Sequence, residues 1–112
     1  MPNTYKRLGA INPSANTQTN VYVVPAATSA VISTITVCNQ SGSNASYSLM
    51  LMNSSEFSTT APGATFLVRG ATVPAADSII LTLGLTANAG MVLAANASIS
   101  SLSFGAFGTE IT

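Results

Sequence analysis

The sequence predicts an all-β fold: a single antiparallel β-sandwich, Ig-like or jelly-roll-like, of about seven or eight short strands. Short apolar runs alternate with clusters of Gly, Pro, Asn and Ser, at the spacing of roughly eight to twelve residues that is typical of such folds. The strongest runs are rich in Val, Ile and Thr, which suit a pleated strand. No repeat of fixed period and no linker interrupts residues 1–112, so we expect one domain.

The first half of the chain contains four predicted strands, each followed by a turn signal. They are Tyr5–Ala10, Thr19–Val24, Ala30–Cys38 and Ala45–Met52. The segment 1–20 is interpreted either as an N-terminal arm or as a first strand at the edge of the sandwich.

The third of these runs is predicted to be a central, largely buried strand. Strict alternation places Val31, Ile35 and Val37 on one of its faces. Ile32 and Cys38 then fall on the other face, where a free cysteine usually acts as a small buried hydrophobe. In the fourth run the same rule puts Met50 and Met52 together on one face.

The second half is predicted to contain a long surface loop, Asn53–Gly63, followed by further short strands. These strands are Thr65–Arg69, Ile79–Leu83, Met91–Ala95 and Ser98–Phe107, with a bend expected at Leu83-Gly84-Leu85. A helix is an alternative for the alanine-rich segment 87–101, although Gly90 and Asn96 argue against it.

Charge and histidine content exclude most enzyme chemistries. The chain has three basic residues, three acidic residues and no histidine, and only 5% of its residues are charged. Without histidine there is no imidazole base, no Ser–His or Cys–His dyad and no ordinary zinc site. The carboxylates Glu56, Asp77 and Glu110 lie far apart in sequence, and Asp77 is interpreted as a turn side chain. We therefore expect no catalytic residue, no cofactor and no metal.

The sequence also lacks the features that bind nucleic acids or insert into membranes. Lys6, Arg7 and Arg69 are the only basic side chains, too few for a phosphate-binding patch. No run approaches the length of a membrane span, and no signal-peptide pattern follows the N-terminus. We expect neither nucleic-acid nor membrane binding, and a protein that is made in the cytoplasm and not secreted.

The surface is predicted to be covered by partner subunits. The net charge is zero and the mean hydropathy is +0.47, so little repulsion keeps copies apart. Permanent interfaces are depleted in charge and resemble a domain core cut in half. We expect a homo-oligomer, with a trimer as one possibility. The candidate interface residues are Lys6, Arg7, Met50, Met52 and Ile99.

Several strings resemble a known family. Val24–Asn39, Asp77–Thr86, Leu102–Thr112 and the opening Tyr5–Gly9 are similar to segments of small β-sandwich virion proteins of tailed bacteriophages, including cyanophages. The resemblance covers most of the chain, whereas residues 39–70 look divergent. These strings carry strand and turn residues and no catalytic ones.

The resemblance implies a virion structural protein located in the phage particle and made in the host cytoplasm. One placement is a capsid decoration or cement protein bound to the major capsid protein or to other virion proteins. The second is a tail, baseplate or fibre-associated module. A lesser alternative is a host-surface carbohydrate-binding module, for which the loops Asn39–Asn44 and Asn53–Pro62 are the candidates. Such modules usually expose aromatic rings, whereas Tyr22, Tyr47, Phe104 and Phe107 have core-like spacing.

Overall fold

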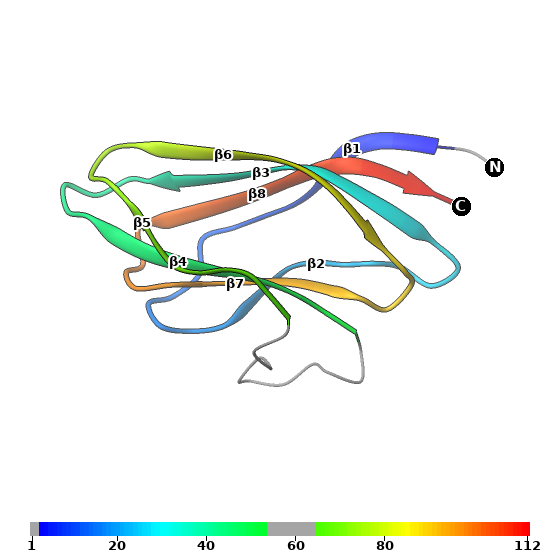
Figure 1. Ribbon diagram of the computed structural model, residues 1–112, viewed down its shortest axis with the longest axis horizontal. Coiled ribbons are helices and arrows are strands. Elements are labelled where there is room, and N and C mark those ends of the chain that lie inside the picture. Colours follow the sequence, from blue (N-terminus) through cyan, green and yellow to red (C-terminus); the bar gives the residue numbers. More distant parts are fainter. Residues whose placement is uncertain (1–2, 54–64) are drawn as a thin grey trace.

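The computed structural model describes residues 3–53 and 65–112, which form eight strands (Figure 1). The strands are β1 (Asn3–Ile11), β2 (Thr19–Val23), β3 (Ser29–Asn39), β4 (Ala45–Met52), β5 (Phe66–Val73), β6 (Ser78–Ala87), β7 (Val92–Ala97) and β8 (Leu102–Ile111). The all-β prediction is confirmed. The loop predicted over Asn53–Gly63 lies, apart from Asn53, outside the described residues.

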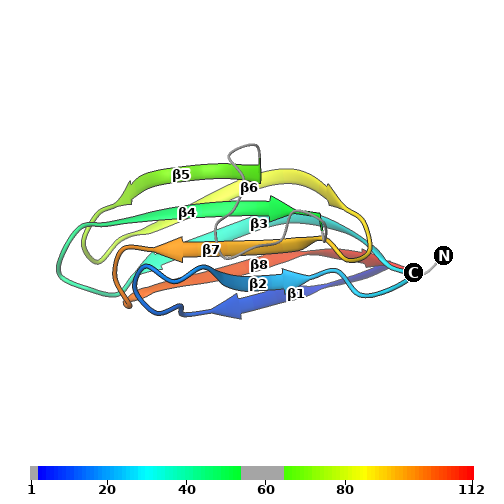
Figure 2. The same cartoon turned by 90° about the horizontal axis from the view of Figure 1, so that it is seen from below.

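The strands form two antiparallel four-stranded sheets, with the orders β1-β8-β3-β6 and β2-β7-β4-β5. Figure 1 shows the two sheets as stacked layers, and Figure 2 views them face on, with the strands of one sheet in front of those of the other. Pairing is nested: β1 pairs with β8, β2 with β7, β3 with β6 and β4 with β5. This is an antiparallel ribbon wound on itself, the arrangement of the eight-stranded jelly roll. Of the two topologies that the sequence leaves open, the structure has the jelly roll.

One apolar core fills the space between the sheets. Its fully buried members include Ile32 and Ile35 of β3, Leu49 of β4 and Leu102 of β8. Aromatic contact joins the layers, because the ring centroids of Tyr47 and Phe104 lie 6.1 Å apart at a tilt of 57°. Alternation within each strand therefore supplies the core from both sheets.

A β-bulge in β3 exchanges the predicted faces of Val31 and Ile32, whereas those of Ile35, Val37 and Cys38 are as predicted. The register with β8 shifts between Ile32 and Thr34, because Ser33 is an extra residue opposite the consecutive residues Gly108 and Phe107. The register with β6 shifts at the same place in the opposite sense, because two residues of β6, Leu83 and Gly84, lie across from Ser33. Ser33 Oγ donates to the carbonyl oxygen of Phe107, 3.2 Å away. Because one extra residue reverses the alternation, Ile32 shares the core face with Ile35. Val31 and Cys38 are only partly buried.

Strand bounds in the second half differ from those predicted. β5 continues four residues beyond Arg69 to Val73. β6 continues as a strand through Gly84, and at the predicted bend its register with β3 is irregular. The run from Val92 to Ala97 is a strand, so the helical alternative is not realised there. β8 begins at Leu102, since the preceding segment 98–101 is a turn.

Met50 and Met52 are buried, whereas candidate interface residues are expected to be exposed. They lie on the opposite side of β4 from Leu49 and form a second cluster with Val92 and Ala94, against which Phe66 packs. The alternation that separated them from the main core was correct. Their exposed fractions of 1% and 0% show that this face is nevertheless covered.

Candidate interface on the outer face of the β1-β8-β3-β6 sheet

The outer face of the β1-β8-β3-β6 sheet carries exposed apolar side chains and little charge. Tyr5 is 80% exposed, Ile80 is 67% exposed and Phe107 is 38% exposed. In the strand register Arg7 lies directly opposite Phe107, and Tyr5 lies opposite Thr109 two residues further along. Among the described residues of these four strands, Arg7 is the one charged residue whose side chain lies on this face.

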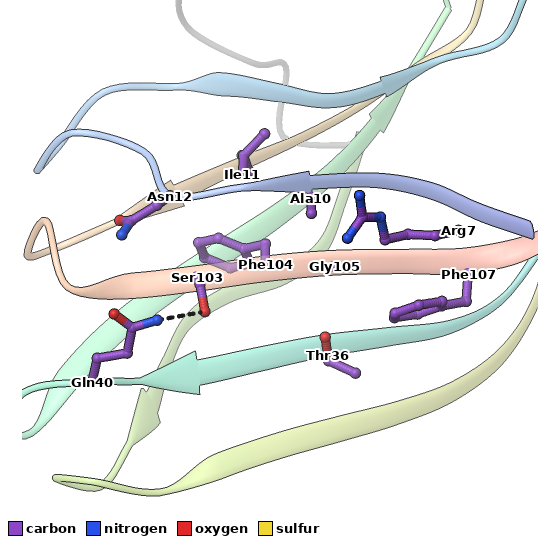
Figure 3. Close-up of a pocket in the computed structure, with 10 residues that line it drawn as sticks. All are labelled: Arg7, Ala10, Ile11, Asn12, Thr36, Gln40, Ser103, Phe104, Gly105 and Phe107. Atoms are coloured by element: carbon purple, nitrogen blue, oxygen red, sulfur yellow. Dashed lines mark hydrogen bonds between the residues drawn. The ribbon is translucent and has the colours of Figure 1, made fainter.

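A shallow groove of about 400 Å³ crosses this face over β8. Figure 3 shows Arg7 and the Phe107 ring at one end of the groove and Asn12 and Gln40 at the other. Gly105 lies between them, where a Cβ atom would approach Thr36 Oγ1 to 2.9 Å and Phe107 Cε1 to 3.3 Å. The missing side chain of Gly105 therefore keeps the middle of the groove open.

Hydrogen bonds fix the polar end of the groove. Gln40 Nε2 donates to Ser103 Oγ at 3.3 Å (Figure 3). In the amide orientation that satisfies its neighbours, Asn12 Nδ2 donates to the carbonyl oxygens of Ser100 at 2.6 Å and Leu102 at 3.1 Å. Both amides are thus held by neighbouring groups before anything binds, which lowers the entropy cost of using them in recognition.

The groups that line the groove are suited to binding. Phe107 offers an aromatic surface, Arg7 a guanidinium, and the amides and hydroxyls offer hydrogen bonds.

In the part of the chain that the structure describes, no three His, Cys, Asp or Glu side chains come together as metal ligands. Cys38 is a free, partly buried thiol among these residues.

The five predicted interface residues have different fates. Arg7 lines the groove. Lys6 forms an ion pair with Glu110. Ile99 lies in the turn before β8 and packs against the main core, while Met50 and Met52 are buried as described above. Contact of any of them with a partner stays a prediction.

Tyr5, Phe107 and Ile80 were missed as surface residues. The signal for Phe107 was present, because Phe104 and Phe107 are three residues apart and a regular strand places them on opposite faces. Phe104 is 2% exposed and sits in the core, whereas Phe107 faces outward. The expectation that all four aromatics are core residues is therefore wrong for Phe107.

Two turn predictions have clear outcomes. Asp77 Oδ1 accepts a hydrogen bond from the Ser78 amide at 2.8 Å, and Ala76 before it has φ of 55°. Asp77 is confirmed as a turn side chain. In the loop that was a sugar-binding candidate, by contrast, the Asn39 side chain is 1% exposed and points inward. It cannot reach a ligand.

A polar cluster ties the two sheets together where β8 ends. Glu110 accepts hydrogen bonds from Tyr22 OH at 2.6 Å and from Lys6 Nζ at 3.1 Å. These two bonds, that of Tyr22 first, hold the pKa of the Glu110 carboxyl below its ordinary value. Burial, and then the bond to Glu110, raises the pKa of the Tyr22 phenol.

The Glu110 cluster predicts a loss of stability in acid. Because the pKa of Glu110 is lower in the folded chain, its contribution is complete above the ordinary value of 4.5 and is lost as the pH falls through the folded value. Glu110→Gln should lower the free energy of unfolding by about 1–2 kcal/mol near neutral pH. Urea unfolding from about pH 7 to about pH 3 should show a shallower acid loss in this variant. Asp77→Asn is the control, and equal flattening in the control would contradict the assignment.

The comparisons with known proteins found limited likeness. No protein-family model and no curated protein matches the chain. Among solved structures, two crystal structures of a pentameric capsid protein isolated from metagenomic phage sequences are similar, each at 18% identity and a TM-score of 0.30. The matches cover 91% of this chain, which spans about 60% of the length of those proteins (61% and 59%). A likeness of this size does not assign a function to this chain. Within the described residues, no helix has the length and apolar character needed to cross a membrane.

Proposed function

We propose that this chain is a structural protein of a phage particle, and specifically a decoration protein that binds the outside of the capsid. The observation that carries the proposal is the outer face of the β1-β8-β3-β6 sheet, with its exposed Tyr5, Ile80 and Phe107 beside a single charge. Such a surface fits a protein partner, because interface cores are enriched in aromatic residues and arginine and depleted in other charges.

Two further features support this proposal. The resemblance of the strand strings to small phage virion proteins covers most of the chain. The jelly roll also occurs in viral capsid domains, although the same fold serves lectins and other functions, so the fold counts only as an analogy.

The mechanism that we propose is geometric. The sandwich acts as a rigid body, 45 Å in its longest dimension, whose outer face lies against capsid subunits. Phe107 and the fixed amides of Asn12 and Gln40 supply the contacts, and Arg7 orients the chain toward an acceptor group on the partner. Each contact is weak, and many copies on one lattice raise the total strength of attachment.

Attachment through this face can be tested with particles of the phage that encodes the chain. Phe107→Glu should reduce binding to particles lacking the protein by about tenfold or more, since a charge is placed in the groove. Val23→Glu is the matched control, because Val23 is 48% exposed on the other sheet. Thermal unfolding of both variants verifies that they remain folded. Equal binding by the two variants would contradict the proposed surface.

Quantitative mass spectrometry of purified particles then tests the placement. Hundreds of copies per particle are expected for a decoration protein, whereas a few tens or fewer would indicate the tail.

The groove, with the Phe107 ring and the amides of Asn12 and Gln40, also favours a second candidate, the binding of a host-surface glycan. Absence from the particle together with binding to a glycan array would replace the first proposal with this second one.

A further inference from the structure

The edges of the two sheets differ in how well they are protected. Edge strands present unpaired backbone groups, and proteins usually guard them with charges, prolines, bulges or short length. β2 is only five residues long. β1 carries Lys6 and Arg7, and β5 carries Arg69. In contrast, β6 is ten residues long and contains no charged residue and no proline. Its one irregularity, at Leu83 and Gly84, leaves the first five residues as a regular edge.

The strand β6 also leaves apolar surface half-covered. Its inward side chains Ile79, Leu81, Leu83 and Leu85 pack against the main core, but each is only partly buried. On the outward side Ile80 is 67% exposed. Within the described residues β6 pairs only with β3, so its second edge has no strand beside it.

We propose that β6 pairs with β6 of a second copy of this chain, in an antiparallel dimer that joins two sheets into one. This inference concerns self-association and does not depend on the proposed capsid binding. The evenly paired part of β6 is Ser78–Thr82, which lies in unbroken register against Thr34–Cys38. It reads Ser-Ile-Ile-Leu-Thr and is almost symmetric about Ile80.

This symmetry makes the segment complementary to itself. With the twofold axis at Ile80, Ile80 faces its own copy on the outer side of the joined sheet. Ile79 then lies opposite Leu81 of the partner on the inner side, and Ser78 lies opposite Thr82. Apolar side chains meet apolar ones and hydroxyls meet hydroxyls, which is the cross-strand pairing that stabilises antiparallel sheets. A twofold contact of this kind uses the same patch on both copies and closes at a dimer.

Charge also favours a second copy over a different partner. β6 offers no ionic group that would select an acidic or basic partner strand. The chain as a whole has zero net charge, so two copies approach without mutual repulsion.

The purified protein alone tests this pairing, by light scattering coupled to size exclusion and by analytical ultracentrifugation over a concentration series. The wild type should be a dimer, and Ile80→Lys should raise the dissociation constant by about tenfold or more, because two like charges then face each other. Ile80→Asp should do the same. An equimolar mixture of the two variants should associate again. Tyr5→Lys is the matched control on the other edge of the same sheet and should leave the dimer unchanged.

A cross-link provides a second readout. In a Cys38→Ser background, Ile80→Cys should form an intermolecular disulfide, since directly opposed residues of antiparallel strands have Cα atoms about 4.5–5.5 Å apart. Tyr5→Cys in the same background should not cross-link. A monomeric wild type, or a dimer that survives Ile80→Lys, would overturn the pairing. Either result leaves the test of capsid binding unaffected, because that test uses Phe107.

Discussion

Asn39→Asp is expected to destabilise the protein by at least about 3 kcal/mol. The Asn39 side chain is 1% exposed and is surrounded by backbone groups at one end of the sandwich. Its Nδ2 donates to the carbonyl oxygens of Ser43, Val73 and Pro74 at 2.8, 3.1 and 3.2 Å. Its Oδ1 accepts from the amide and the hydroxyl of Ser41 at 3.0 and 2.8 Å.

An aspartate side chain has the same shape as asparagine, but its ionised carboxylate accepts hydrogen bonds where the asparagine NH2 group donates them. A buried carboxylate cannot donate to three carbonyl oxygens and would instead repel them, which raises its pKa in the folded state. The loss of stability should therefore grow as the pH rises above the ordinary range of an aspartate and shrink in acid. Urea unfolding at several pH values measures both effects.

Asn44→Asp is the matched control for this prediction. Asn44 Oδ1 accepts from the Ala75 amide at 3.1 Å in an exposed position, and a carboxylate retains that bond. The control should change the free energy of unfolding by no more than about 0.5 kcal/mol. Similar losses in the two variants would show that the Asn39 donors do not hold this end of the sandwich together.

Gly108→Ala is expected to cost about 3 kcal/mol or more, or to prevent folding. A Cβ at this position would overlap the carbonyl oxygen of Val31 and lie within 3.1 Å of the Ile32 Cα. Both obstacles are backbone atoms of β3, so no side-chain rotation relieves the contact. The strands β3 and β8 would have to separate beside the bulge at Ser33.

Gly84→Ala supplies the control, because nothing lies within 4 Å of a Cβ added there. This variant should be neutral or slightly stabilised, since alanine restricts the unfolded chain more than glycine. If Gly108→Ala yields no soluble protein, Gly9→Ala tests the same principle, because its Cβ would overlap the carbonyl oxygen of Val21. If Gly108→Ala and Gly9→Ala both unfold at the wild-type midpoint, the close backbone approaches at these two glycines are contradicted.

Much of the strand layout could be predicted from local pattern. The bounds Ala45–Met52 agree with β4, and β2 and β3 agree within one residue at each end. The faces of Val31 and Ile32 could not be predicted, because the bulge at Ser33 forms against β8, and its bonding partner Phe107 lies 74 residues away in the sequence. Gly84 predicts a bend, whereas it lies within β6, at the point where the register with β3 is irregular.

The candidate surface was less accessible to prediction than the fold. Alternation correctly separated Met50 and Met52 from Leu49, but it cannot tell whether the second face of a sheet is covered. The groove depends on the register that places Arg7 of β1 opposite Phe107 of β8. These two strands lie at opposite ends of the sequence, so no local sequence pattern indicates that they pair.

The nested pairing also orders the way in which the chain can fold. The strands β4 and β5 are neighbours in sequence and make the shortest of the four nested closures, whereas β1 and β8 bring Asn3 beside Ile111 and make the longest one. Loop-closure entropy grows with length, and contacts of high sequence separation slow folding. The groove is assembled from β1, β3 and β8. Its surface is therefore completed with the longest loop closure, and partly folded intermediates that lack the β1–β8 pairing do not display it.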